Sequence, residues 1–206
     1  MKYNLKKYLS LMTAFFLVLL LLPIRVWAST PISILYTNDV HCGLEGYSKL
    51  AAYRQSLTDA GISTVLVDAG DHVQGELIGT MDQGESIIDI MNQMNYDYAV
   101  PGNHEFDYKV PQFLSLMNRA TFNYLSANFK HADGTDIMDA YAIKEIDGHK
   151  IGFVGICTPE SYTKSTPVYF QDASGNYVYT FSEDTFYATI QAAVDAAKAA
   201  GAEAIV

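Results

Sequence analysis

The chain has 206 residues, 23 of them acidic and 13 Lys or Arg, so its formal net charge is −10 at pH 7. This acidic balance argues against a nucleic acid polymer as partner, because such binding depends on Lys and Arg displacing counterions. Only two cysteines are present, which excludes a disulfide framework, so a packed core must stabilise what the length predicts to be a single domain.

The N-terminal segment, residues 1–28, has the pattern of a signal peptide. Lysines near the N-terminus precede an apolar run from Leu9 to Leu22, and Ala28 offers a cleavage site before Ser29. The run is shorter than the about 20 residues that a membrane-spanning helix needs. We expect no stable membrane span after cleavage, with an uncleaved anchor as the alternative, and residues 29–206 would then form a secreted, periplasmic or cell-surface domain.

Apolar runs and amphipathic stretches alternate through the next part of the chain. Strands are predicted at 32–37, 63–68, 96–100 and 123–127, and helices near 47–60, 85–95 and 111–119. Runs such as Val65-Leu66-Val67 lack polar alternation, which is typical of a parallel sheet covered on both faces. The order predicts an α/β fold built from βαβ units.

A hairpin is predicted at 141–156, where Asp147-Gly148 separates two strand-like runs and could add an antiparallel edge to the sheet. Residues 158–181 are polar, rich in tyrosine and without clear periodicity. We expect a long loop there, with a substrate-side insertion as one possibility. A helix is predicted over 183–200, and a strand starts at 204–206.

Three polar loops follow the first three predicted strands. They contain Asn38-Asp39-Val40-His41, Gly70-Asp71 and Gly102-Asn103-His104-Glu105-Phe106-Asp107. Asp39 and Asp71 are 32 residues apart, as are Asp71 and Asn103, which matches the roughly 30 residues of one βαβ unit. Because the loops after parallel strands gather at one edge of a sheet, these three should converge.

Convergence would bring together two carboxylates, an imidazole and an amide, from Asp39, His41, Asp71 and Asn103. This set of nitrogen and oxygen donors suits Zn²⁺, Mn²⁺ or Fe better than soft metals. Asp71 comes from the middle strand and could bridge two ions roughly 3.5–4 Å apart, the separation used in two-metal phosphoryl chemistry. We therefore expect two divalent metal ions as cofactors and a small phosphorylated substrate, whose charge the ions would offset.

Three ordered blocks resemble the signatures of the secreted 5′-nucleotidases, which are calcineurin-like metallophosphoesterases. The blocks are Tyr36 to His41, Asp68 to Asp71 with Gly75, and Gly102 to Asp107, and the similarity extends over roughly residues 32 to 160. The resemblance implies a layered α/β/β/α sandwich and an enzyme that hydrolyses phosphate esters of nucleotides. It also implies that Asp39, His41, Asp71 and Asn103 are metal ligands, that His104 stabilises the phosphoryl transition state, and that Asp107 orients His104.

The sequence departs from the family pattern at two positions where glycine is common, Cys42 and Lys109. Cys42 would be strained if its φ were positive. The family also has further histidine-bearing loops and a C-terminal domain that holds the nucleoside, and neither is found before Val206. We therefore expect a domain that is incomplete at its C-terminus, binds one metal weakly and turns over little or no substrate by itself.

Less specific interpretations stand beside these. An Asp-x-His pair alone is more often a turn, and the aromatic residues Tyr96, Tyr98, Phe106, Tyr108 and Phe113 are expected to pack in the core rather than stack on a nucleobase. Glu105 is expected to face solvent or to support a ligand, and His72 to be a packing or rim residue. Cys42 and Cys157 are expected to be buried free thiols, with a disulfide as the alternative.

The alternative functions are a 2′,3′-cyclic-nucleotide phosphodiesterase and, if the chain is naturally this short, a non-catalytic metal-binding surface module. A phosphodiesterase would differ from a 5′-nucleotidase mainly in the C-terminal domain, so residues 1–206 do not decide between them. The surface module would keep the metal-binding loops but would not hydrolyse phosphate esters.

Overall fold

A four-stranded parallel sheet carries the three polar loops. The computed structural model describes residues 12 and 31–206, so the predicted signal peptide lies outside the described residues except for Met12. The strands β1 (Ile32–Thr37), β2 (Ser63–Asp68), β3 (Tyr98–Ala99) and β4 (Asn123–Tyr124) are hydrogen-bonded in the order β1-β2-β3-β4. All three pairings are parallel, which confirms the predicted succession of βαβ units.

The first two strands have the predicted bounds, but β3 and β4 are shorter than the predicted ranges 96–100 and 123–127. Beyond the short ladders, single backbone hydrogen bonds continue the alignment. The Val100 N–H donates to the Asp68 carbonyl at 3.0 Å, and the Leu125 N–H donates to the Ala99 carbonyl at 2.8 Å. The chain therefore stays extended past each short strand and delivers its loop to the same edge of the sheet.

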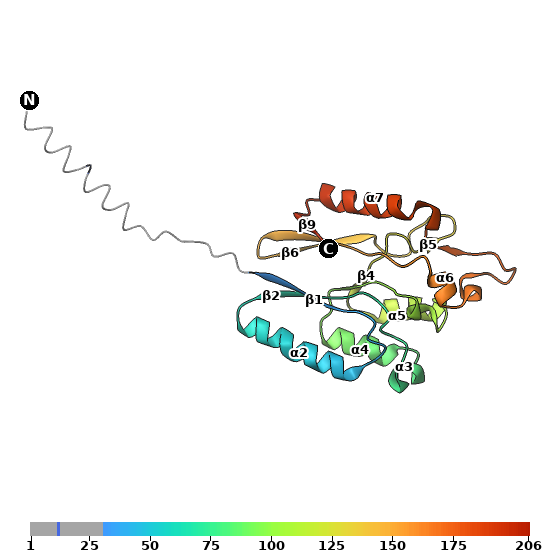
Figure 1. The fold of residues 1–206 in the computed structure, drawn as a ribbon, viewed down its shortest axis with the longest axis horizontal. Helices are drawn as coiled ribbons and strands as arrows, with labels where there is room; N and C mark the ends of the chain where they lie inside the picture. Colours follow the sequence, from blue (N-terminus) through green and yellow to red (C-terminus); the bar gives the residue numbers. More distant parts are fainter. Residues whose placement is uncertain (1–11, 13–30) are drawn as a thin grey trace, which may run out of the picture. The chain divides into compact units, whose positions relative to one another are not determined.

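Helices cover one face of this sheet (Figure 1). They are α2 (Leu44–Asp59), α3 (Leu77–Met81), α4 (Glu85–Gln93) and α5 (Val110–Arg119). Ile88 and Met91 of α4 and Phe113 of α5 are fully buried in a cluster that includes Leu66 of β2. The predicted helices are confirmed, whereas the short helix α3 was not predicted.

The predicted hairpin forms, but it belongs to a second sheet. The strands β6 (Tyr141–Ile146) and β7 (His149–Val154) pair antiparallel, and β9 (Ala204–Ile205) pairs parallel with β7. Asp147 and Gly148 both have positive φ, as a type I′ turn requires. The prediction of an antiparallel edge on the first sheet was therefore wrong.

The second sheet packs face to face on the first because both expose apolar side chains between them. Phe153 of β7 and Tyr98 of β3 have ring centroids 4.9 Å apart, and Val65 and Ile151 are buried in the same cluster. The sequence pattern predicted the two strands of the hairpin, but it did not predict that the hairpin would pack on a face of the first sheet.

The 3-10 turn η3 (Glu183–Thr185) leads into helix α7 (Phe186–Ala199), which covers the outer face of the second sheet (Figure 1). Ala193 and Ala197 are its buried positions. A Cβ on Gly152 of β7 would lie 3.4 Å from the Ala197 Cβ, so the small residues let helix and sheet approach closely. The order of layers is helices, sheet, sheet, helix, which confirms the α/β/β/α sandwich.

The segment 158–181, predicted as a long loop, is anchored in the core. It contains α6 (Ser161–Lys164), η2 (Pro167–Phe170) and β8 (Tyr179–Thr180), which pairs antiparallel with β5 (Lys130–His131). Phe170 in η2 and Phe181, which directly follows β8, are fully buried, and both rings contact Phe106. The absence of periodicity correctly indicated irregular backbone but did not show that its aromatic residues enter the core.

Other expectations concern single residue types. Cys42 and Cys157 are buried free thiols, as expected. Tyr96, Phe106 and Phe113 are buried in the core, which confirms packing as their role. Within the described part of the chain, no helix combines the length and apolar character that a membrane crossing needs.

Gly155 should tolerate no side chain, because an added Cβ would overlap the Leu125 carbonyl oxygen. We predict that Gly155→Ala lowers the free energy of unfolding by about 2 kcal/mol or more, as overpacking against backbone does. Gly46 in α2 has open space around it, so Gly46→Ala should instead raise the free energy of unfolding by about 0.5 kcal/mol. Urea denaturation of both variants checks this, and equal effects would contradict the close contact at Gly155.

Candidate metal centre

The loops after β1, β2 and β3 meet at the carboxyl edge of the parallel sheet; we call residues 38–43 the first loop, 69–76 the second and 101–107 the third. Backbone hydrogen bonds join the first loop to the second. The Asp39 N–H donates to the Gly70 carbonyl and the His41 N–H to the Asp71 carbonyl, both at 3.0 Å. The main chains that carry two predicted metal ligands, Asp39 and His41, are thus fixed to the main chain that carries a third.

The second and third loops are in equally close contact. A Cβ on Gly70 would lie 2.6 Å from the Gly102 nitrogen, and a Cβ on Gly102 would overlap Asp71 Oδ1. Asp71 Oδ1 accepts a hydrogen bond from the His104 N–H at 2.8 Å. Glycine at both positions is therefore what allows the Asp71 carboxylate to reach the third loop.

The first and third loops meet through their histidines. The rings of His41 and His104 pack edge to face with centroids 4.7 Å apart. Each of the three loops therefore contacts the other two, and the predicted ligands Asp39, His41, Asp71 and Asn103 come from loops that converge.

Three of these residues hold a backbone conformation that L-amino acids rarely adopt. Asp39, His41 and Asp71 have φ values of 59°, 47° and 61°. Left-handed backbone costs roughly 1 kcal/mol for each such residue and persists only where the surroundings enforce it, often at functional sites. Cys42 adopts φ 63°, so the condition under which we expected strain at this residue is met.

The tautomer of His41 follows from its neighbours. Nδ1 lies 2.9 Å from the Gln74 carbonyl oxygen, which can only accept, so Nδ1 carries the hydrogen. Nε2 lies 2.9 Å from Asp39 Oδ1. Burial lowers the pKa of His41, but the Gln74 carbonyl and the carboxylates of Asp39 and Asp71 outweigh this effect and raise the pKa.

This environment fits a cation at Nε2. A neutral His41 would direct a lone pair at a carboxylate oxygen, which is repulsive unless a proton or a metal ion lies between them. A histidine whose Nδ1–H donates to a backbone carbonyl is also the usual arrangement of a metal-ligating imidazole. The donors present therefore suit a divalent ion.

The ligand side chains do not surround one point as they stand. Among residues 12 and 31–206, no three His, Cys, Asp or Glu side chains are arranged to hold a metal ion. Asp39 is turned toward His41, and one oxygen of Asp71 is turned toward the His104 N–H. Binding would need rotation of exposed side chains such as that of Asp39, which is 61% exposed.

His104 and Asp107 form a hydrogen-bonded pair on the third loop, where His104 begins the 3-10 turn η1 (His104–Phe106). His104 Nδ1 lies 2.6 Å from Asp107 Oδ2. The other Asp107 oxygen accepts from the Ser165 hydroxyl at 3.2 Å. Ser165 belongs to the segment 158–181 and carries no motif, so no feature of the sequence indicated that it would support this pair.

Two buried residues, His72 in the second loop and Glu105 in the third, differ in how well the sequence predicted them. Glu105 is fully buried, so the expectation that it faces solvent was wrong. Its burial is compatible with the alternative, that Glu105 supports a metal ligand. His72 is also buried, with Nδ1 2.6 Å from Asp68 and Nε2 2.6 Å from the Tyr124 hydroxyl. Burial lowers the pKa of His72, but Glu105 and Asp68 outweigh this effect and raise the pKa to about 9.

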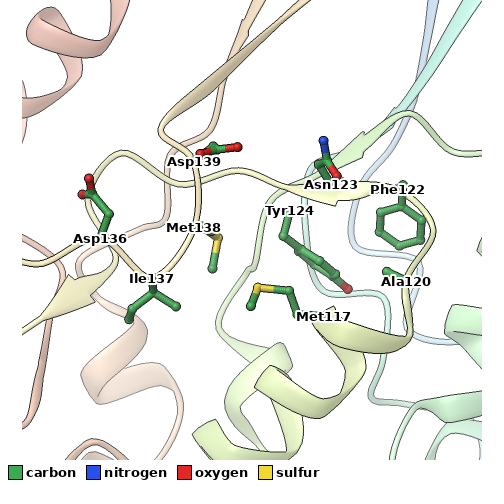
Figure 2. A pocket seen from close by; sticks show the side chains of 9 residues that line it. All are labelled: Met117, Ala120, Phe122, Asn123, Tyr124, Asp136, Ile137, Met138 and Asp139. Carbon is green, nitrogen blue, oxygen red and sulfur yellow. The ribbon is translucent and has the colours of Figure 1, made fainter.

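A hollow of about 400 Å³ lies beside β4, between the end of α5 and residues 136–139. Figure 2 shows Met117, Tyr124 and Met138 around it. None of the predicted ligands, nor His104 or Asp107, lines this hollow. The candidate metal centre is therefore the exposed junction of the three loops and not this cavity.

Comparisons with known proteins identify the family of the chain. The family model "Calcineurin-like phosphoesterase" matches residues 32–185. The 5′-nucleotidase of Bos taurus is 32% identical over 167 residues, which cover 69% of this chain and 28% of the bovine protein. The chain thus spans less than a third of the length of this relative.

Solved structures show the same fold. The 5′-nucleotidase precursor from Thermus thermophilus matches with a TM-score of 0.70 and 23% identity, over 84% of this chain and 35% of that one. The calcineurin-like phosphoesterase YfkN from Bacillus subtilis matches with a TM-score of 0.68 and 24% identity, over 84% of this chain and 59% of that one. At these identities the likeness concerns the fold alone.

Lys109 lies between the third loop and α5, and its backbone conformation is strained. Its φ of 72° and ψ of 157° fall in a region that is essentially restricted to glycine, at a cost of about 1–3 kcal/mol. We predict that Lys109→Gly raises the free energy of unfolding by about 1 kcal/mol, after the greater chain entropy of glycine is subtracted. Lys109→Ala is the control, because it removes the same contact with the Tyr169 ring but keeps the strain. Chemical denaturation that finds Gly no better than Ala would contradict strain at this residue.

Proposed function

The chain belongs to the calcineurin-like phosphoesterase family, and we propose that it forms part of a metal-dependent phosphoester hydrolase that acts on nucleotides outside the cytoplasm. One observation carries the proposal: three loops bring Asp39, His41, Asp71 and Asn103 to one edge of the sheet, beside the His104–Asp107 pair. The relative named 5′-nucleotidase supports a nucleotide as the substrate.

Asp39 and His41 would hold one divalent ion, Asn103 would hold a second, and Asp71 would bridge the two. Zn²⁺, Mn²⁺ or Fe fits this set of oxygen and nitrogen donors. Such ions would supply Lewis-acid stabilisation of the charge on the phosphoryl oxygens. They would also offset the acidic character of the chain, whose net charge of −10 otherwise disfavours a phosphorylated substrate.

The His104–Asp107 pair supplies the second part of the mechanism. Asp107 accepts the hydrogen bond from Nδ1, which fixes the orientation of the ring. In the cationic form of the imidazole, Nε2 also carries a hydrogen and would donate it to a phosphoryl oxygen. A positioned imidazole of this kind stabilises the charge that develops as the phosphate ester breaks. The hydroxyl of Ser165 and the ring of His104 both hydrogen-bond to Asp107, so its carboxylate cannot rotate freely.

Action outside the cytoplasm rests on the N-terminal segment. Its early lysines, apolar run and small residue at Ala28 favour export and cleavage by the secretory route. Two buried free thiols are compatible with an oxidising compartment, because burial protects them from pairing with other molecules.

Metal loading and turnover should separate in two variants of the natural full-length protein that contains these residues. His104→Ala should retain its metal and lower kcat for adenosine monophosphate by roughly 10²–10³-fold, the usual loss on removing one transition-state donor. Asp71→Ala should lose metal at both positions, because the bridging carboxylate is absent. Metal analysis and phosphate release measure the two effects.

Unchanged kinetics in His104→Ala would remove this residue from the mechanism, and two ions still bound in Asp71→Ala would refute the bridge. The same assay with 2′,3′-cyclic adenosine monophosphate separates a nucleotidase from a cyclic-nucleotide phosphodiesterase. Hydrolysis of neither substrate by metal-loaded wild type would contradict the proposed activity.

A further inference from the structure

The side chain of Glu105, in the third loop, is fully buried. Its carboxylate accepts hydrogen bonds from four backbone N–H groups. Oε2 accepts from Gly102 at 2.6 Å and from Asp71 at 2.8 Å. Oε1 accepts from His72 at 2.8 Å and from Val73 at 3.3 Å. One carboxylate thus joins the second loop to the third.

The contact is reciprocal. Glu105, from the third loop, binds the backbone N–H of Asp71, and the Asp71 carboxylate binds the backbone N–H of His104 in the third loop at 2.8 Å. We call these hydrogen bonds between Glu105, Asp71 and His104 the loop clamp. Charge-assisted hydrogen bonds from a carboxylate to backbone N–H groups are about twice as strong as neutral ones, so the clamp fixes both loops firmly.

A purely structural role is the simpler interpretation. Burying a carboxylate is costly unless it is fully hydrogen-bonded and near a compensating charge, and Glu105 meets both conditions, since His72 Nδ1 lies 3.4 Å from Oε1. Its partners, however, are not spread over the core. Two of them are the backbone of Asp71 and of Gly102, which directly precedes Asn103, so the carboxylate fixes the main chain at two predicted ligands.

We propose that Glu105 is a positioning residue that sets the affinity of the centre for metal ions, because it holds the main chains of Asp71 and Asn103 in a fixed relative position. This inference rests on the proposed function, since it assigns Glu105 a role toward the same ions. Glu105 itself would touch neither metal nor substrate, because both of its oxygens are occupied by the loop backbones.

The variant Glu105→Gln in the 206-residue chain tests this directly. The amide has the same shape, but its NH₂ group would face the N–H groups either of Gly102 and Asp71 or of His72 and Val73, so two of the four hydrogen bonds to the loop backbones are lost. We expect binding of Zn²⁺, measured by calorimetry below the melting temperature, to weaken by about 10–100-fold, the usual loss when a residue that orients a ligand is changed. In metal-free protein of the same variant, hydrogen exchange should become faster at the pair of amides that loses its acceptor, either Gly102 and Asp71 or His72 and Val73.

Asp97→Asn is the matched control. Asp97 precedes β3, outside the three loops, and its carboxylate accepts from the Leu66 N–H at 2.8 Å and pairs with Lys144 at 2.7 Å. The same carboxylate-to-amide change should lower the melting temperature but leave Zn²⁺ affinity within about twofold, since additive effects are expected for sites without shared partners.

The outcomes separate this inference from the proposed function. Glu105→Gln that is less stable but binds Zn²⁺ as wild type does would overturn the positioning role and leave the metal centre intact. Wild-type chain that binds no Zn²⁺ would overturn the proposed function and this inference together. If Glu105→Gln does not fold, Glu105→Asp takes its place: its carboxylate is one methylene shorter and cannot reach both loops, so wild-type affinity in a folded Glu105→Asp would equally contradict the proposal.

Discussion

The close approach of the second and third loops is the constraint on which the rest of the site depends. The main chains at Gly70 and Gly102 leave no room for a Cβ on either residue, and a buried carboxylate, Glu105, accepts hydrogen bonds from both loops. The parallel sheet brings the loops to one edge, but it does not by itself bring them into contact. The contact places Asp71 beside the third loop, and the proposed bridge between two ions requires that position.

The same constraint explains where the molecule stores strain and charge. Asp39, His41 and Asp71 have positive φ, and backbone hydrogen bonds between the first and second loops hold two of them there. Burial lowers the pKa of His41, but the Gln74 carbonyl and the carboxylates of Asp39 and Asp71 outweigh this effect and raise it. A site that concentrates negative charge around one imidazole, on a rigid backbone, is prepared to bind a cation rather than an anion. The proposed ions would relieve that repulsion and so couple metal binding to the stability of the loops.

Much of this could be predicted from the sequence, and the failures have identifiable causes. Short apolar runs predicted the bounds of β1 and β2 to the residue, and the equal spacing of the polar loops predicted that the three loops converge. The hairpin was placed wrongly because alternation does not tell which sheet face a strand pair covers. Ser165 was missed because it reaches Asp107 across 58 residues. Glu105 lies within the block Gly102 to Asp107, but a charged residue is rarely fully buried unless it is paired. Only the backbone N–H groups that it binds in the structure explain why Glu105 can be buried.

The most direct measurement is anomalous diffraction at the zinc absorption edge from crystals of the chain grown with Zn²⁺. We expect an anomalous peak at the junction of the three loops, within about 2.0–2.2 Å of oxygen or nitrogen donors from Asp39, His41 and Asp71. Asn103 should face the same region. Zinc bound elsewhere on the chain, with these side chains directed away from one another, would contradict the claim that the three loops form a metal centre.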